Sequence, residues 1–146
     1  MKFYPPLMVL ACVGVQFILN RFLPTPDILP DWVGGVGYLL IIASVAVIIS
    51  IKLKFDKAET SIMPDGEPTA LLDQGLFAYS RNPIYLTMAF IVAGSALAIG
   101  TLYGLLMVPV FIIAVSKVWI AFEEKNLEAA LGDAYLDYKS RVNRWI

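Results

Sequence analysis

The stretch "NPIYLTMAFIVAGSALAIGTLYGLLMVPVFIIAVS", residues 82–116, carries no charged side chain over its entire length. A helix that crosses a bilayer needs about 20 mostly apolar residues, so this stretch is too long for one ordinary span and short for two. The sequence around Gly100, "AIGTLYG", favours a tight turn because glycine tolerates turn conformations that other residues avoid. We therefore predict two membrane helices, at about 83–99 and 102–122, that pair as a hairpin.

The N-terminal part of the chain contains two more apolar stretches of membrane-spanning length. The first, about 3–23, is preceded by Lys2 and has no small-residue cleavage site, so we interpret it as an anchor rather than a removed signal peptide. The second, about 32–51, is uncharged and is closed by Lys52. The sequence thus predicts an all-α integral membrane protein, a single domain over residues 1–146 with about four transmembrane helices.

The composition supports a membrane protein and argues against several kinds of site. Of the 146 residues, 59% are hydrophobic and 16% are charged, whereas soluble domains have roughly 45–50% and about 25%. The net charge of −1 provides no basic field for nucleic acid. The chain has no histidine and one cysteine, Cys12, which excludes histidine-based catalysis and a disulfide framework. We expect no metal site and no nucleic-acid partner.

The positive charges are divided unevenly between the two sides of the predicted bundle. Four spans place both termini on one side, and all of the 11 lysines and arginines except Arg21 then fall on or near that side. Such a bias is typical of cytoplasmic loops. We therefore expect both termini, the loop 53–82 and the C-terminal segment 123–146 to face the cytoplasm. Glycines at the start of the second helix permit close contact with a second copy, as in a homodimer.

The C-terminal segment 123–146 is amphipathic, since its apolar residues recur at steps of three and four. This spacing predicts a helix that lies along the membrane surface, with a weak point at Gly132. We expect Tyr135 and Tyr138 to cover the membrane surface rather than to contact a cofactor.

Most of the reactive side chains fall into two clusters that the hairpin would bring together. One is "GLFAYSRNPIYL", residues 75–86, and the other is the pair Glu123 and Glu124. If the two helices form a hairpin, a basic and aromatic patch faces a carboxylate pair at the cytoplasmic interface.

Each of these residues also has an ordinary structural interpretation. Arg81 is compatible with a simple interfacial charge, and Glu123 and Glu124 with the polar start of a solvated helix. Tyr79 and Tyr85 are compatible with the aromatic belt of a membrane protein. From the residues alone we obtain a small helical membrane protein with a polar site on its cytoplasmic face, but no reaction.

The combined pattern "GLFAYSRNPIYL … AFEEKNLEAALGDAYLDYKSRVNRWI" resembles the isoprenylcysteine carboxyl methyltransferase and phospholipid N-methyltransferase superfamily. The resemblance covers about residues 53–146. One position departs from the family pattern, because Asn82 replaces a histidine and cannot titrate. The matching residues are Gly75, Phe77, Tyr79, Arg81, Pro83, Tyr85, Glu123, Glu124, Gly132, Tyr135 and Tyr138.

The resemblance implies an S-adenosylmethionine-dependent methyltransferase of the bacterial inner membrane. Its acceptor would be a lipophilic small molecule or a lipid, methylated on a carboxylate or an amine at the cytoplasmic leaflet. The implied catalytic residues are Arg81, Glu123 and Glu124, and Arg141 and Arg144 are weaker candidates for orienting the substrate. The implied cofactor-binding residues are Gly75, Phe77, Tyr79, Arg81, Asn82, Pro83, Tyr85 and Glu123.

Two other classes of protein remain open at this point. The superfamily resembles membrane sterol reductases in its C-terminal half, so a nicotinamide-dependent reductase is one alternative, although such chains are normally much longer. The other is a non-enzymatic membrane partner or assembly protein that has kept the fold, which the loss of the family histidine mildly favours. The cofactor that binds distinguishes the three classes.

Overall fold

The computed structural model describes residues 4–23, 29–58 and 71–146. Part of the expected loop 53–82 lies outside the described residues, as does Lys2. The described part of the chain is helical and contains no strand. Its helices are α1 (Pro5–Phe22), α2 (Trp32–Lys57), η1 (Gly75–Ala78), α3 (Pro83–Ile99), η2 (Tyr103–Leu106), α4 (Met107–Val115), η3 (Ser116–Ile120), α5 (Ala121–Leu131) and α6 (Asp133–Arg141).

Within the part of the chain that the structure describes, three helical stretches are long and apolar enough to cross a membrane: α1, α2 and the continuous run Tyr103–Leu131. The fourth, α3, is apolar but has 17 residues. At 1.5 Å per residue it is about 25 Å long, a little less than the hydrocarbon core of a typical bilayer. The prediction of an all-α integral membrane protein is therefore confirmed.

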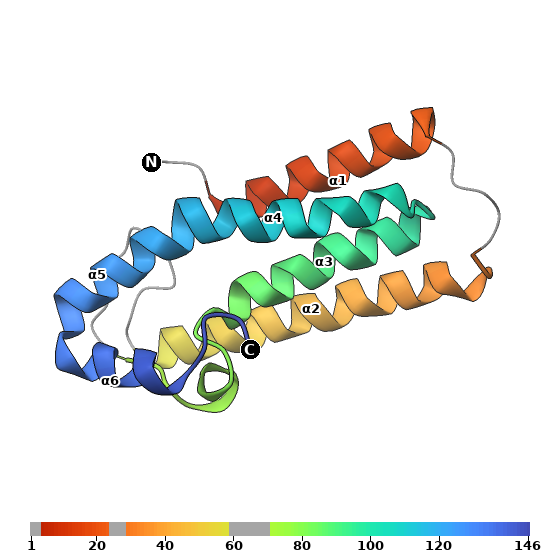
Figure 1. Ribbon diagram of the computed structural model, residues 1–146. Coiled ribbons are helices and arrows are strands. Elements are labelled where there is room, and N and C mark those ends of the chain that lie inside the picture. The colour runs from red at the N-terminus through yellow and green to blue at the C-terminus, as the bar shows by residue number, and fades with distance from the viewer. Residues whose placement is uncertain (1–3, 24–28, 59–70) are drawn as a thin grey trace.

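The central helix of the bundle is α3, which lies between α2 on one side and α1 and α4 on the other (Figure 1). It ends at Gly100, whose φ of 78° is the left-handed conformation that favours glycine. The chain then returns through the short turn η2 into α4, so the predicted hairpin is confirmed. Helices α2 and α3 touch backbone to backbone, since a Cβ on Gly37 would lie 2.5 Å from the carbonyl oxygen of Gly94.

A buried polar cluster ties α1 to the hairpin at the end near Gly100. The side-chain amide of Gln16 donates to the carbonyl oxygens of Val92 at 2.8 Å and Gly104 at 3.2 Å. The hydroxyl of Ser95 donates to Oε1 of Gln16 at 2.6 Å. Because polar groups inside a bilayer must be satisfied within the protein, this cluster fixes the position of α1 on α3.

The long helix that begins with α4 contains a π-helical turn, η3, before it continues into α5. The least exposed residues along α4, η3 and α5 are Phe111, Val115 and Ile120, each 0% exposed, and Glu124 at 6%, followed by Trp119 at 9%. The step from Val115 to Ile120 is five residues, whereas the steps before and after it are four. One extra residue is therefore accommodated in this turn, as in the π-bulges of other helices. The helix predicted at 102–122 accordingly runs on to the end of α5.

Helix α6 folds back from α5 across the ends of α2 and α3 (Figure 1). The reversal takes place at Gly132, which has a φ of 53°. As predicted, α6 is amphipathic, with Asp137 and Arg141 exposed and paired at 2.9 Å. The expectation that Tyr135 and Tyr138 cover the membrane surface is wrong: both are buried in a core that also contains Phe77.

Candidate functional site

The turn that precedes α3 is held in place by contacts from two other helices. The turn begins at Gly75, whose φ of 66° lies in the left-handed region that favours glycine. The ring of Phe77 packs edge-on against Phe55 of α2, with the ring centres 5.8 Å apart. From α6, the hydroxyl of Tyr138 donates to the carbonyl oxygen of Phe77 at 2.7 Å. Burial raises the pKa of Tyr138 to about 12, so its hydroxyl stays protonated and remains a donor at neutral pH.

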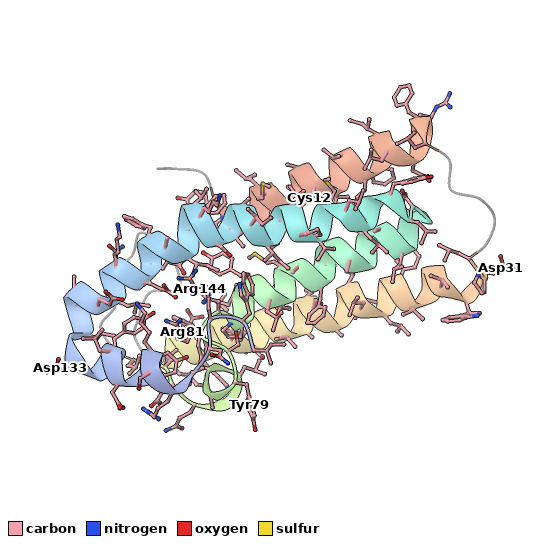
Figure 2. All side chains as sticks on the ribbon, in the orientation of Figure 1. Cys12, Asp31, Tyr79, Arg81, Asp133 and Arg144 are labelled. Atoms are coloured by element: carbon pink, nitrogen blue, oxygen red, sulfur yellow. The ribbon has the colours of Figure 1, made fainter. Side chains whose placement is uncertain are left out.

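The centre of the site is a carboxylate held between two arginines. Glu124 of α5 is 8% exposed at its side chain, and its Oε1 lies 3.1 Å from Nη1 of Arg81. Arg144, in the tail after α6, donates from Nε to Oε1 at 3.0 Å and from Nη2 to Oε2 at 2.5 Å. The labelled side chains of Arg81 and Arg144 lie in the space enclosed by α5, α6 and the start of α3 (Figure 2). The hydrogen bonds to Glu124 raise the pKa of Arg144, which keeps it charged.

One donor in this centre has no hydrogen-bond partner among the described residues. The side chain of Arg81 is 10% exposed, and its Nε is buried and unpaired. Its Nη1 also donates to the hydroxyl of Tyr135, at 3.5 Å. Since a buried donor without a partner is unfavourable, Arg81 is suited to bind an anionic group that the chain itself does not supply.

The C-terminal tail is attached to the turn 80–82 through its backbone. The amide of Arg81 donates to the carbonyl oxygen of Asn143 at 3.0 Å. The carbonyl oxygen of Arg144 accepts from Nδ2 of Asn82 at 3.1 Å and from Oγ of Ser80 at 3.4 Å. Asn82 precedes Pro83 at the start of α3, but its side chain forms no cap on that helix. Asn82, at the position where the resemblance leads us to expect a histidine, therefore binds the tail.

A second pair joins α3 to α5 closer to the apolar part of the bundle. The hydroxyl of Tyr85, in the first turn of α3, donates to Oε1 of Glu123 at 2.5 Å. Consecutive residues of α5 thus have different partners: Glu124 is neutralised by arginines, whereas Glu123 forms no ion pair with any of the described residues.

The structure does not bring all of the predicted site residues together. Tyr79 is 76% exposed and points away from the site at the edge of the molecule (Figure 2). Arg141 pairs with Asp137 on the exposed face of α6 instead of joining the arginine centre. Sequence reasoning in turn missed Ser80 and the packing role of Tyr135, although the repeated Gly-x-x-Tyr-x-x-Tyr spacing was a signal for the latter. Among the described residues, no cluster of three or more histidine, cysteine or acidic residues is suited to a metal.

Comparison with known proteins identifies the family of this helical membrane protein. The phospholipid methyltransferase family matches residues 32–134, which is most of the chain and includes the turn before α3 and both glutamates. The chain belongs to this family. A protein of Haemophilus influenzae, described as uncharacterized, is 36% identical over 63 residues, which are 43% of this chain and the whole of that protein. No solved structure matches the chain significantly.

Proposed function

We propose that this protein is a membrane methyltransferase that uses S-adenosylmethionine to methylate a lipophilic acceptor at the cytoplasmic leaflet. The observation that carries the proposal is the buried, unpaired Nε of Arg81, which lies, like Glu123 and Glu124, within the residues that match the methyltransferase family. The acceptor would be a small molecule or a lipid, methylated on a carboxylate oxygen or on an amine nitrogen.

The donor set of the site fits the charges of S-adenosylmethionine. Arg81 offers its Nε to the carboxylate of the cofactor, because charge-assisted bonds from a guanidinium to a carboxylate are strong and directional. Glu123 and the ring of Tyr85 are suited to the cationic groups, since both carboxylates and aromatic faces attract cations. When bound, the cofactor supplies a methyl group on a positively charged sulfur.

The residues of the site contribute mainly by orientation. Methyl transfer from a sulfonium is an in-line displacement, so correct alignment of the acceptor with the methyl group supplies much of the rate. An amine acceptor must lose a proton before it reacts, and Glu123 is placed to take that proton. The bond from Tyr85 holds the Glu123 carboxylate in one orientation for this role. A carboxylate acceptor would need no proton transfer.

The position of the site supports a substrate that reaches it from the bilayer. Glu123 follows the mainly apolar stretch 107–122, in which Lys117 is the one charged residue, so it lies at the boundary between the apolar part of the bundle and its polar end. A lipophilic acceptor moving within one leaflet would meet the reactive groups at this level. The excess of lysine and arginine at the same end of the bundle supports the cytoplasmic leaflet.

The test is calorimetric binding of S-adenosylmethionine and S-adenosylhomocysteine to detergent-purified protein, with a nicotinamide dinucleotide as a third ligand. We expect saturable binding of the first two and none of the third. Arg81→Ala should weaken binding by at least about ten-fold, whereas Lys52→Ala, which removes an exposed ion pair with Asp56, should leave it unchanged. Folded, monodisperse protein that binds neither sulfur compound would refute the proposal.

A further inference from the structure

We propose that Arg144 is a positioning residue that occupies Glu124 and thereby keeps Nε of Arg81 free for an anionic ligand. The inference rests on the proposed function, in which Arg81 receives the carboxylate of the cofactor. It gives a role to the C-terminal tail, which lies beyond the residues that match the family.

The first step of the argument is the unequal division of Glu124 between the two arginines. Arg144 forms a two-pronged pair with both carboxylate oxygens, through Nε at 3.0 Å and Nη2 at 2.5 Å. Arg81 contributes a single contact, from Nη1 at 3.1 Å. A guanidinium and a carboxylate that meet without competition usually pair through two parallel bonds. Arg144 is therefore the group that prevents Glu124 from forming a two-pronged pair with Arg81.

The second step is what Glu124 would do without Arg144. Nε of Arg81 is buried and unpaired, which is an unfavourable state for a donor. A Glu124 carboxylate released by Arg144 would satisfy that donor by moving from Nη1 to the edge of the Arg81 guanidinium that carries Nε and Nη2, where it would form a two-pronged pair. The anionic ligand would then compete with a carboxylate that is part of the chain.

The third step is the way in which Arg144 is itself fixed. Its side chain is 40% exposed, so burial does little to hold it in place. Its carbonyl oxygen is instead bound by Asn82 at 3.1 Å and by Ser80 at 3.4 Å, and the amide of Arg81 binds the preceding carbonyl. The turn that carries Arg81 thus also orders the residue that keeps Arg81 available.

The test is a double-mutant cycle read by calorimetric binding of S-adenosylhomocysteine. Arg144→Ala should weaken binding by about ten-fold in the otherwise unchanged protein, but by no more than about three-fold in the Glu124→Gln background. The reason is that the neutral amide no longer competes for Arg81. An equal loss in both backgrounds would mean that Arg144 binds the ligand directly or only supports the fold, and would overturn the inference.

A second measurement needs no ligand and observes the Arg81 side chain directly by NMR. The ¹⁵Nε–¹Hε resonance of Arg81, assigned through Arg81→Lys, should move downfield in Arg144→Ala as a new bond to Glu124 forms. Asn82→Asp, which replaces the donor with an acceptor facing the Arg144 carbonyl, should move it in the same direction. An unchanged resonance in both variants would overturn the inference. Failure of the unsubstituted protein to bind S-adenosylhomocysteine would instead refute the proposed function.

Discussion

The hydroxyl of Tyr85 lies 2.5 Å from Oε1 of Glu123, and this bond joins the first turn of α3 to the start of α5. The two residues are 38 positions apart, and the hairpin turn at Gly100 lies between them. The bond therefore closes the hairpin at the end opposite its turn. It also fixes the orientation of a carboxylate for which the structure shows no arginine partner among the described residues.

The role of Glu123 can be tested by comparing two ligands that differ in one charge. S-adenosylmethionine carries a positive sulfur and S-adenosylhomocysteine a neutral one. If Glu123 stabilises the positive sulfur, Glu123→Gln should weaken binding of the first by about ten-fold and leave the second nearly unchanged. Calorimetry measures both constants, with Glu128→Gln as the control because Glu128 pairs with Lys139. Equal losses for both ligands would contradict this role.

The close crossing of α2 and α3 predicts a sharp difference between two neighbouring glycines. A Cβ at Gly37 would lie 2.5 Å from both the Gly94 carbonyl oxygen and the Ala98 amide nitrogen, and backbone atoms cannot move aside locally. Gly37→Ala should therefore destabilise the protein by about 1–3 kcal/mol. Gly35 has nothing within 4 Å of the same position, so Gly35→Ala should not destabilise it. Unfolding in mixed detergent micelles measures both, and equal stabilities would exclude the close crossing.

The hydrogen bond from Tyr138 to Phe77 can be removed without changing the packing of the ring, and we expect its removal to lower the stability of the protein. Tyr138→Phe keeps the ring but leaves the Phe77 carbonyl without this donor, which should cost about 1–2 kcal/mol. The turn at η1 should also become more sensitive to protease. The control is Tyr38→Phe, at an exposed position of α2. A Tyr138→Phe protein as stable as this control would show that the bond contributes nothing.

The polar cluster at Gln16 should affect stability but not ligand binding. Gln16→Leu removes two bonds to carbonyl groups and the acceptor for Ser95, so we expect a loss of about 1–2 kcal/mol. The cluster lies near the Gly100 end of the hairpin, away from the arginine centre. The dissociation constant of S-adenosylhomocysteine for the folded protein should therefore stay the same. A weaker constant would show that the two ends of the bundle are coupled.

The hairpin was predictable because its signals are local. The length of the uncharged stretch 82–116 and the turn at Gly100 determine where α3 ends and where the chain returns to the membrane. Once the hairpin is assumed, Arg81 and Glu124 have to lie at the same end of it, and the structure pairs them at 3.1 Å. Length and charge along the chain were sufficient for this part of the site.

The contribution of the tail was not predictable, because it depends on a reversal of direction at Gly132. Arg141 and Arg144 are three residues apart and looked equivalent in the sequence. Arg141 ends a helix whose outer face pairs it with Asp137, whereas Arg144 lies on an extended tail that turns toward Glu124. Likewise, Tyr79 is exposed and Phe77 is buried because the chain forms a tight 3₁₀ turn at this point. The pattern of hydrophobic residues in the sequence does not reveal that turn.

The five-residue step in η3 has a consequence for comparing this chain with its relatives. Removing one residue from Ser116–Ile120 would convert the turn into ordinary α-helix, and the buried faces of Val115, Ile120 and Glu124 would still align. A relative that is one residue shorter here would keep the same glutamate facing the arginines. Alignments in this family should therefore allow a single gap between the apolar helix and the Glu-Glu pair, and should match the glutamates from the C-terminal side.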